Sequence, residues 1–302
     1  MSAKQPTLLN LPIEIANQVL EKLHLLDMLT CRKVCRSLRT AVDKIETHST
    51  HLTVQLRSNH VSICVDRIET NYYYDDDSSN CFNRKQKAVE GVDCMNAFFN
   101  DLKLFLKYAL YLEVWSKDIY REHFVSSLVD ILREEENNIH VETIELLQFY
   151  KCDAVLLILP LLNSQTLRSI KLRSTSLGDG FERIACLDQW KKAKKFSSDT
   201  WLDCSHIEHF FHFEEFSFRT EPFPIQNVIK VRDDLLQRCM FQNCTIVISK
   251  LNWKPVEFAR IFQPDCAGGD TFTLHYSNDN SNFEIRFGVF DRVHGWLTIG
   301  RC

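Results

Sequence analysis

Hydrophobic positions near the start of the chain follow a helical period. Between residues 11 and 23, apolar side chains fall on one half of a helical cylinder and polar ones on the other. Asn10 is a suitable N-cap, and Pro12 fits the first turn, where its missing N–H costs no hydrogen bond. A second helix is predicted to begin at Asp27 and to carry apolar positions as far as Ala41. About forty residues cannot bury this much apolar surface alone, so a partner or the following domain must cover it.

The next segments alternate with period two. Residues 52–56 and 61–65 place apolar side chains at every second position on either side of a short polar segment, which predicts a β-hairpin. The stretch from Tyr72 to Asn80 contains three consecutive aspartates and follows neither period, so a solvated loop is predicted there. An acidic run of this kind is typical of surface, and contact with a basic partner is the alternative.

Beyond about residue 88, a six-residue pattern of apolar-x-x-apolar-x-apolar recurs and alternates with segments of helical period. Its clear copies are Ala109/Leu112/Val114, Val141/Ile144/Leu146, Leu167/Ile170/Leu172 and Phe213/Phe216/Phe218, and its weaker copies are Ala193/Phe196/Ser198 and Phe241/Cys244/Ile246. The helical segments between them are 95–106, 124–132, 154–162, 181–190, 207–213 and 225–236.

This alternation predicts a short, curved, leucine-rich-repeat-like α/β solenoid with a parallel sheet, and a conventional doubly wound sheet is the alternative. The central positions, counted from Leu112 to Ile246, are 20 to 32 residues apart, a range that overlaps the leucine-rich-repeat period. Regular repeats have Asn or Cys after the hexad, whereas Phe149 and Thr175 stand at that place here. Three segments near the end, 271–276, 283–287 and 296–299, are predicted to form antiparallel strands that close the open end.

The order of residue types in the first predicted helices resembles an F-box over about residues 8–48. The matching features are Leu11-Pro12-x-Glu14, an apolar helix, Asp27 with Leu29, and Arg32-x-Val34-Cys35-Arg36. The resemblance implies an all-α module that docks on a Skp-type adaptor and, through it, a cullin. The residues that it assigns to docking, or to the packing that shapes the docking face, are Leu11, Pro12, Ile15, Leu20, Leu23, Leu29, Val34 and Cys35.

Two positions depart from the F-box pattern. Leu38 stands where the family often has Trp, and Leu25 stands where Pro is frequent. An ordinary helical cap on the downstream domain, with no external partner, is the alternative interpretation of the helices.

A second resemblance extends over at least residues 140–265. The succession LDQWKKAKKF at 187–196, IEHFFHF at 207–213, VRDDLL at 231–236 and FQNCTI at 241–246 looks like the FTH domain, domain of unknown function 38. An FTH domain behind an F-box is the architecture of nematode-type F-box proteins. The expected division is an F-box at 8–48, a hairpin and acidic loop at 49–86, and a repeat domain at 87–302.

Together the two resemblances imply a non-catalytic substrate adaptor of a Skp–cullin–F-box ubiquitin ligase, in which the repeat domain binds an unknown protein target. A scaffold that binds a regulatory protein, such as an RNA-binding one, without leading to its degradation is the alternative. Oligomeric state does not follow from the sequence.

The composition of the chain argues against several classes of function. The 36 Lys and Arg against 40 Asp and Glu give no support for direct nucleic-acid binding or a membrane surface. No export signal or long apolar run is visible, so an intracellular protein of the cytoplasm or the nucleus is expected. The twelve cysteines include no Cys-x-x-Cys pair, and neither a metal nor a cofactor is expected.

The remaining clusters favour structural roles. His206, His209 and His212 alternate with phenylalanines and are predicted to pack and cap rather than bind metal. The lysines of residues 191–195 fall at a predicted helix C-terminus, where cations complement the helix dipole. Phosphate-binding, dinucleotide-binding and nucleophile-elbow motifs do not occur, so no catalytic residue is expected.

Overall fold

The structure is a computed structural model that divides into two compact units, Met1–Leu112 and Glu113–Cys302. It describes residues 12–23, 25–42, 50–57, 60–73, 94–116, 121–135, 139–149, 151–175, 177–203, 205, 207–249, 254–269, 271–279, 281–289 and 294–302. Each unit is described by itself below.

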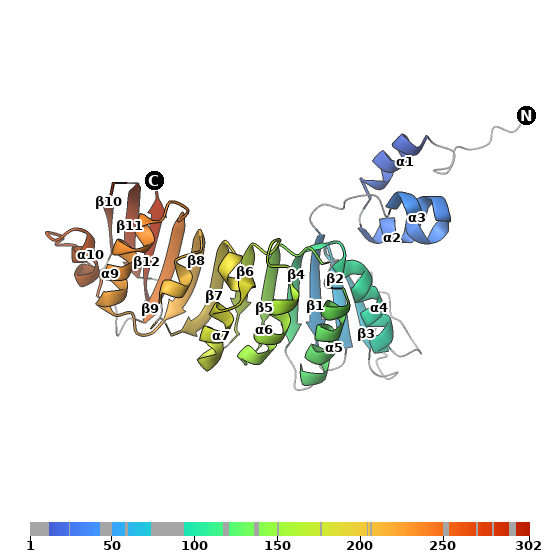
Figure 1. Ribbon diagram of the computed structural model, residues 1–302, viewed down its shortest axis with the longest axis horizontal. Coiled ribbons are helices and arrows are strands. Elements are labelled where there is room, and N and C mark those ends of the chain that lie inside the picture. Colours follow the sequence, from blue (N-terminus) through green and yellow to red (C-terminus); the bar gives the residue numbers. More distant parts are fainter. Residues whose placement is uncertain are drawn as a thin grey trace, which may run out of the picture. The chain divides into compact units, whose positions relative to one another are not determined.

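The first unit begins with three helices (Figure 1), α1 (Ile13–Leu20), α2 (Leu25–Val34) and α3 (Arg36–Val42). The first predicted helix is present and follows Pro12, whose carbonyl accepts the backbone N–H of Ile15 and of Ala16, both at 3.0 Å. The predicted start is wrong by two residues: Pro12 is itself the N-cap residue and not part of the first turn, so the helix starts too late for the predicted cap Asn10, which lies outside the described residues. The module has its own small core, formed by Ala16, Leu20, Met28, Leu38, Ala41 and Val42.

The single helix predicted from Asp27 to Ala41 is two helices with a break at Cys35. The Cys35 carbonyl accepts the N–H of Arg39 at 3.0 Å, and its sulfur lies 3.5 Å from the N–H of Leu38. Cys35 therefore acts as the N-cap of α3, because it satisfies a donor of the first turn that has no helical partner.

Three antiparallel strands follow, β1 (Thr50–Leu56), β2 (His60–Val65) and β3 (Ile68–Tyr73). The first two form the predicted hairpin, in which Val54 pairs with Ile63. Tyr72, where the predicted loop should begin, is instead part of β3 and is fully buried. Its hydroxyl donates to Asp101 on α4 (Cys94–Leu106) at 2.7 Å, which ties this helix to the sheet. The aspartates of the predicted loop lie outside the described residues.

β4 (Ala109–Ser116) crosses the boundary between the units, and the second unit continues as a mixed α/β structure with a long sheet. Its strands are β5 (Thr143–Leu147), β6 (Ser169–Arg173), β7 (Lys195–Leu202), β8 (Glu215–Thr220), β9 (Asn243–Ser249), β10 (Phe272–Ser277), β11 (Asn282–Val289) and β12 (His294–Arg301). Its α-helices are α5 (Arg121–Glu134), α6 (Cys152–Ile158), α7 (Phe181–Ala185), α8 (Asp188–Lys192), α9 (Ile225–Asp233) and α10 (Pro255–Phe262). Four 3-10 turns, Leu159–Leu161, Gly178–Gly180, Ile207–Phe210 and Leu235–Gln237, complete the described helical elements.

Strand and helix alternate as the hexads predict. The second and third patterned positions of each hexad lie in one of the strands β4 to β9, and all of the apolar positions are buried. Strands β5 to β9 are parallel and share one register through their central residues, which pair in the order Ile144, Ile170, Phe196, Phe216 and Cys244; after Ser197 a bulge shifts β7 against β8. Cys244, not Ile246, is thus the central residue of the last hexad. The predicted helix at 207–213 is only a 3-10 turn, and 181–190 is divided between α7 and α8.

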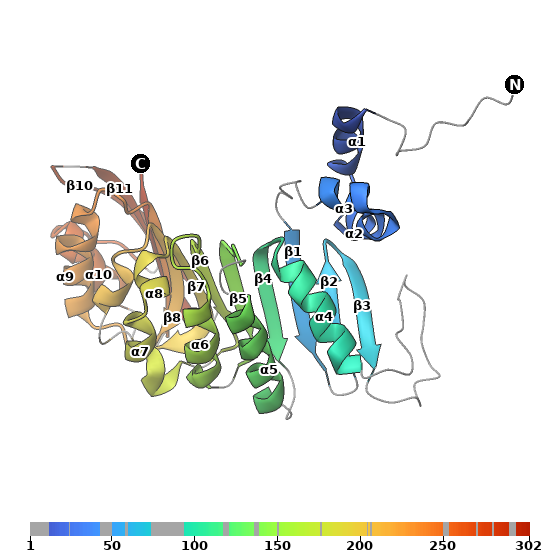
Figure 2. The same ribbon diagram turned by 45° about the vertical axis from the view of Figure 1, so that its right-hand side comes forward.

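The helices α5–α10 lie along one face of this sheet (Figures 1 and 2). The layer between helices and strands is aromatic: the Trp190 ring lies 4.8 Å from Phe196 and 5.1 Å from Phe213, and Phe210 stacks 4.5 Å from Phe218. Offset and edge contacts at these distances add to the free energy gained by burying the rings. The opposite face carries the alternate residues of each strand and is called the helix-free face below.

The three C-terminal strands are antiparallel as predicted, but they lengthen the sheet instead of closing it. Within the second unit the order is β10-β11-β12-β9-β8-β7-β6-β5. β12 pairs with β9 through Leu297 and Ile246, and β10 is the outermost strand. The sheet stays open because each added strand extends the same twisted layer and none returns to pair across it.

Candidate docking surfaces

The N-terminal helices expose apolar side chains on α1 and α2. Val34 at the end of α2 is 65% exposed, and Ile15 and Val19, one turn apart on α1, are 43% and 40% exposed. Pro12 is also exposed. These exposed aliphatic side chains, named together here the α1–α2 face, are candidates for contact with a partner, because several of them occur on one short module.

The eight predicted docking residues fall into different environments. Pro12, Ile15 and Val34 are exposed, whereas Leu20 is fully buried and belongs to the core of the module. Leu23 is half-buried, and Cys35 is half-buried and caps α3. Leu11 and the side chain of Leu29 lie outside the described residues.

Val19 belongs to the α1–α2 face although the docking set omitted it. Its position four residues after Ile15 was the signal, because residues spaced i and i+4 share a helix face. Lys33, Arg36 and Arg39, which stand close to Val34 in the sequence, are also exposed and are called here the basic border. Exposed apolar side chains together with charged ones are typical of a surface that binds a partner protein.

In the second unit, the polar candidates from the sequence are structural. Trp190 donates from Nε1 to the His209 carbonyl at 3.1 Å, and Nε2 of His212 lies 2.7 Å from the Trp190 carbonyl. Burial lowers the pKa of His212, and the hydrogen bond to Trp190 opposes this in part. His206 lies outside the described residues. The two remaining histidines therefore connect the loop after β7 to α8, in agreement with the packing role predicted from the sequence.

Three of the four lysines in the cluster at 191–195 are held in ion pairs. Lys194 contacts Glu214 at 2.7 Å, and Lys195 contacts Glu215 at 2.8 Å. Lys192 lies 3.6 Å from Asp188 one turn earlier in α8. These pairs link β7 to β8 and close the last turn of α8, so the charges of these three lysines are already matched by carboxylates.

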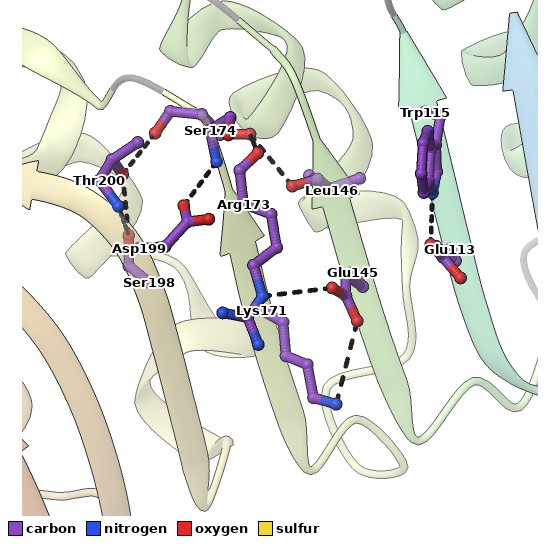
Figure 3. Close-up of polar contacts among 11 residues, drawn as sticks. Glu113, Trp115, Glu145, Leu146, Lys171, Arg173, Ser174, Ser198, Asp199 and Thr200 are labelled. Carbon is purple, nitrogen blue, oxygen red and sulfur yellow. Dashed lines mark hydrogen bonds and ion pairs between the residues drawn. The ribbon is translucent and has the colours of Figure 1, made fainter.

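A polar network lies where β5, β6 and β7 end (Figure 3). The Thr175 hydroxyl, fully buried, lies 3.0 Å from the Leu146 carbonyl and 2.9 Å from the Arg173 carbonyl, and accepts the N–H of Phe149 at 3.4 Å. Thr200 in turn donates to the Thr175 carbonyl at 2.9 Å. Thr175 stands at the place of the missing repeat Asn, and its hydroxyl satisfies backbone groups where the ladder between strands stops.

The helix-free face beside this network is polar and its charges are largely paired. Glu145 lies 3.4 Å from Nε of Arg173 and 3.9 Å from Nζ of Lys171, as Figure 3 shows. Asp199 accepts the backbone N–H of Ser174 at 2.6 Å, and Trp115 donates to Glu113. Such contacts hold the outer side chains of neighbouring strands in defined positions, which suits a surface for recognition.

Within the described ranges, no group of three or more His, Cys, Asp or Glu side chains is arranged to hold a metal ion. Among these same residues, none of the helices has the length and apolar character needed to cross a bilayer.

Comparison with known proteins assigns both parts of the chain. The F-box domain family matches residues 8–50, and the FTH domain family matches residues 122–265. F-box A protein 224 from Caenorhabditis elegans is 24% identical over 303 residues, which cover 93% of this chain and 77% of that protein. No solved structure matches. The chain therefore carries an F-box domain at residues 8–50 and an FTH domain at residues 122–265, and over most of its length it is similar to a nematode F-box protein.

Proposed function

We propose that this chain is a substrate-recognition adaptor of a Skp–cullin–F-box ubiquitin ligase. The α1–α2 face would bind the Skp-type adaptor, which connects the chain to a cullin, and the second unit would hold a protein target. The observation that carries the proposal is the exposure of Val34, Ile15 and Val19 on a domain of the F-box family. In this arrangement the other subunits of the ligase transfer ubiquitin, and the chain acts by raising the local concentration of target lysines.

The eight docking residues predicted from the sequence divide into residues that contact the adaptor and residues that support them. We propose that Pro12, Ile15, Val19 and Val34 contact the adaptor, together with Leu11 and Leu29 from the sequence pattern. Leu20, Leu23 and Cys35 would shape the face from within, because Leu20 is buried and Cys35 caps α3. The basic border of Lys33, Arg36 and Arg39 suits a partner surface that is acidic around an apolar centre.

We further propose that the second unit is a degenerate leucine-rich-repeat-like array, and that the chain divides into an F-box at 8–48, a hairpin region at 49–86 and a repeat domain at 87–302. The common register of β5–β9 and the helices on one face support the repeat. The hydroxyl of Thr175 would replace the Asn of regular repeats. A complex with these partners would assemble in the cytoplasm or the nucleus, without direct contact with nucleic acid or membrane.

A pull-down with a purified Skp-type adaptor tests the proposal. Val34→Asp and Ile15→Asp should each reduce retention of the adaptor at least about tenfold, since a charge would be buried in an apolar contact. Leu157→Asp is the matched control, because Leu157 is 50% exposed on α6 and lies outside the F-box. Equal retention by all four proteins would contradict the proposal.

Depletion of this protein from cells distinguishes an adaptor that leads to degradation of its target from a scaffold that does not. Target proteins captured by the chain should rise in abundance when the chain is depleted, and should fall again when the wild type, but not Val34→Asp, is restored. Unchanged abundance with intact adaptor binding would favour a scaffold for a regulatory protein.

A further inference from the structure

The helix-free face carries a row of side chains on four neighbouring strands. Trp201 on β7 pairs with Arg219 on β8, Arg219 pairs with Val247 on β9, and Val247 pairs with Trp296 on β12. In each of these strands, a residue next to the named one in the sequence faces the helices and is buried; these residues are Leu202, Phe218, Ile246 and Leu297. The four side chains therefore share the outer face and form what is called here the Trp201–Trp296 strip.

Arg219 differs from the other charged residues of these strands. Strands β5–β12 are fully described, and in them every other Lys, Arg, Asp or Glu side chain has an ion pair or a hydrogen bond. The ion pairs are Glu145 with Lys171 and Arg173, Lys195 with Glu215, and Glu284 with Arg286. The hydrogen bonds join Asp199 to the backbone N–H of Ser174, and Arg301 to the Phe241 carbonyl. Arg219 has no such contact within the described part of the chain. A half-buried guanidinium without an acceptor has lost water without gaining a partner, so it is prepared to bind an anion.

Aromatic rings border this arginine. Trp201 is 44% exposed, and its ring lies 5.4 Å from that of His294 on β12, although β8 and β9 separate these two strands. The rings therefore reach over the strands that hold Arg219 and Val247. Trp and Arg are the side chains that contribute most at protein interfaces, and apolar surroundings strengthen a bond between opposite charges.

We propose that the Trp201–Trp296 strip docks an acidic segment of the protein target. An Asp or Glu carboxylate of the segment binds the guanidinium of Arg219, and a neighbouring apolar side chain packs on Trp201. This inference rests on the proposed function, since it names the chemistry of the target that the second unit recognises.

The charges favour a carboxylate over the other anions. Recognition of a phosphorylated residue normally uses a cluster of arginines, whereas Arg219 is the one cation within strands β5–β12 that lacks an ion pair or hydrogen bond, and Arg173 is already paired with Glu145. A nucleic-acid strand requires a continuous track of unpaired positive charge. The chain has a net charge of −4, and the lysines and arginines of neighbouring strands are neutralised by Glu145, Glu215 and Glu284.

The test is a selection of random twelve-residue peptides displayed on phage, with the full-length chain as bait. Peptides enriched by the wild type should contain Asp or Glu next to an aromatic or aliphatic residue. Synthetic copies of the three most enriched peptides should bind Arg219→Gln about tenfold more weakly, as expected for the loss of a charge-assisted bond. A selection on Arg219→Glu should enrich Lys or Arg in place of the acidic residue.

The matched control is Arg286→Gln, which removes an exposed arginine of the same face that is already paired with Glu284. It should bind the three peptides as the wild type does. Trp201→Ala, an exposed position, provides a second variant that does not depend on Arg219 and should also weaken binding.

Enrichment without acidic residues, or the same enriched peptides from the wild type and Arg219→Glu, would overturn the proposal. Tighter binding of a twenty-nucleotide oligouridine than of the peptides would also overturn it, and would identify a nucleic-acid surface. Val34→Asp keeps the two proposals distinguishable: it should lose the Skp-type adaptor and still select acidic peptides, because the strip lies in the second unit.

Discussion

The indole of Trp296 lies directly over Gly288, its partner on β11. A Cβ atom built on Gly288 would lie 2.4 Å from Cε2 of Trp296, closer than a side chain can approach. Glycine at this position thus lets the tryptophan lie against the sheet at the end of the Trp201–Trp296 strip. The contact is rigid on both sides, because one partner is backbone and the other is an aromatic ring.

Gly288→Ala should therefore reduce the free energy of unfolding by about 1–3 kcal/mol, the usual cost of forcing a methyl group into a filled space. The change should also alter tryptophan fluorescence, because Trp296 must move. Gly300→Ala is the control, since nothing lies within 4 Å of its added Cβ. Urea unfolding of the three proteins measures the difference, and equal midpoints would show that the ring is not held against Gly288.

Thr175 supports a second prediction about stability. Thr175→Val keeps the shape of the side chain but removes the hydroxyl that lies 3.0 Å from the Leu146 carbonyl and accepts the N–H of Phe149. Buried backbone groups would lose a partner, and the free energy of unfolding should fall by about 1–3 kcal/mol. Thr245→Val, at a half-buried residue whose hydroxyl contacts Thr298, should cost less than about 0.5 kcal/mol. Similar losses for both variants would argue against a special role for Thr175.

His212 and His60 should make the free energy of unfolding depend on pH. Burial lowers the pKa of His212 and of His60 below the usual histidine value of 6.5, so the folded protein holds fewer protons on these rings than the unfolded chain does. Stability from these groups is therefore present above about pH 6.5 and is lost as the pH falls toward their folded pKa. Thermal unfolding between pH 7.5 and 5 should show this loss, and His212→Gln should reduce its slope. An unchanged slope in that variant would show that His212 is protonated equally in both states.

The cysteines should differ in reactivity. Burial raises the pKa of the Cys244 thiol to about 12, and Cys244 is fully buried at the central position of its hexad. Cys186, Cys239 and Cys302 are exposed. Brief treatment of the native protein with iodoacetamide, followed by peptide mass spectrometry, should modify these three and leave Cys244 unmodified until denaturant is added. Early modification of Cys244 would show that β9 opens readily.

The parts of the fold that could be predicted from the sequence are those with a strict period. Each hexad led to a strand because three apolar positions on one face of a strand must be buried together. The break at Cys35 was missed because a cysteine cap has no common sequence signal, unlike Ser, Thr, Asp or Asn. The shift from Ile246 to Cys244 arose because both residues are buried on the same face, and only strand pairing distinguishes them.

The candidate sites were less predictable. The F-box pattern named Ile15, Val34 and Leu20 together, for docking or for packing behind it, and it could not tell that the first two are exposed and Leu20 is buried, because burial depends on how three short helices pack. The Trp201–Trp296 strip could not be found from spacing, because its members lie far apart in the chain and become neighbours only through the sheet. The bulge between Ser197 and Trp201 is what places Trp201 opposite Arg219, and no period reveals it.

The shared register of β5–β9 has a consequence for how this architecture changes over evolutionary time. In the repeat array proposed above, a strand and its helix would contact only the units before and after them, so a duplication or deletion of one unit would alter the length of the array without disturbing its two ends. A change of this kind near β5 or β6 would leave the Trp201–Trp296 strip whole. Loss of β7, β8, β9 or β12 would remove one of its side chains, and loss of β11 would remove Gly288, over which Trp296 lies.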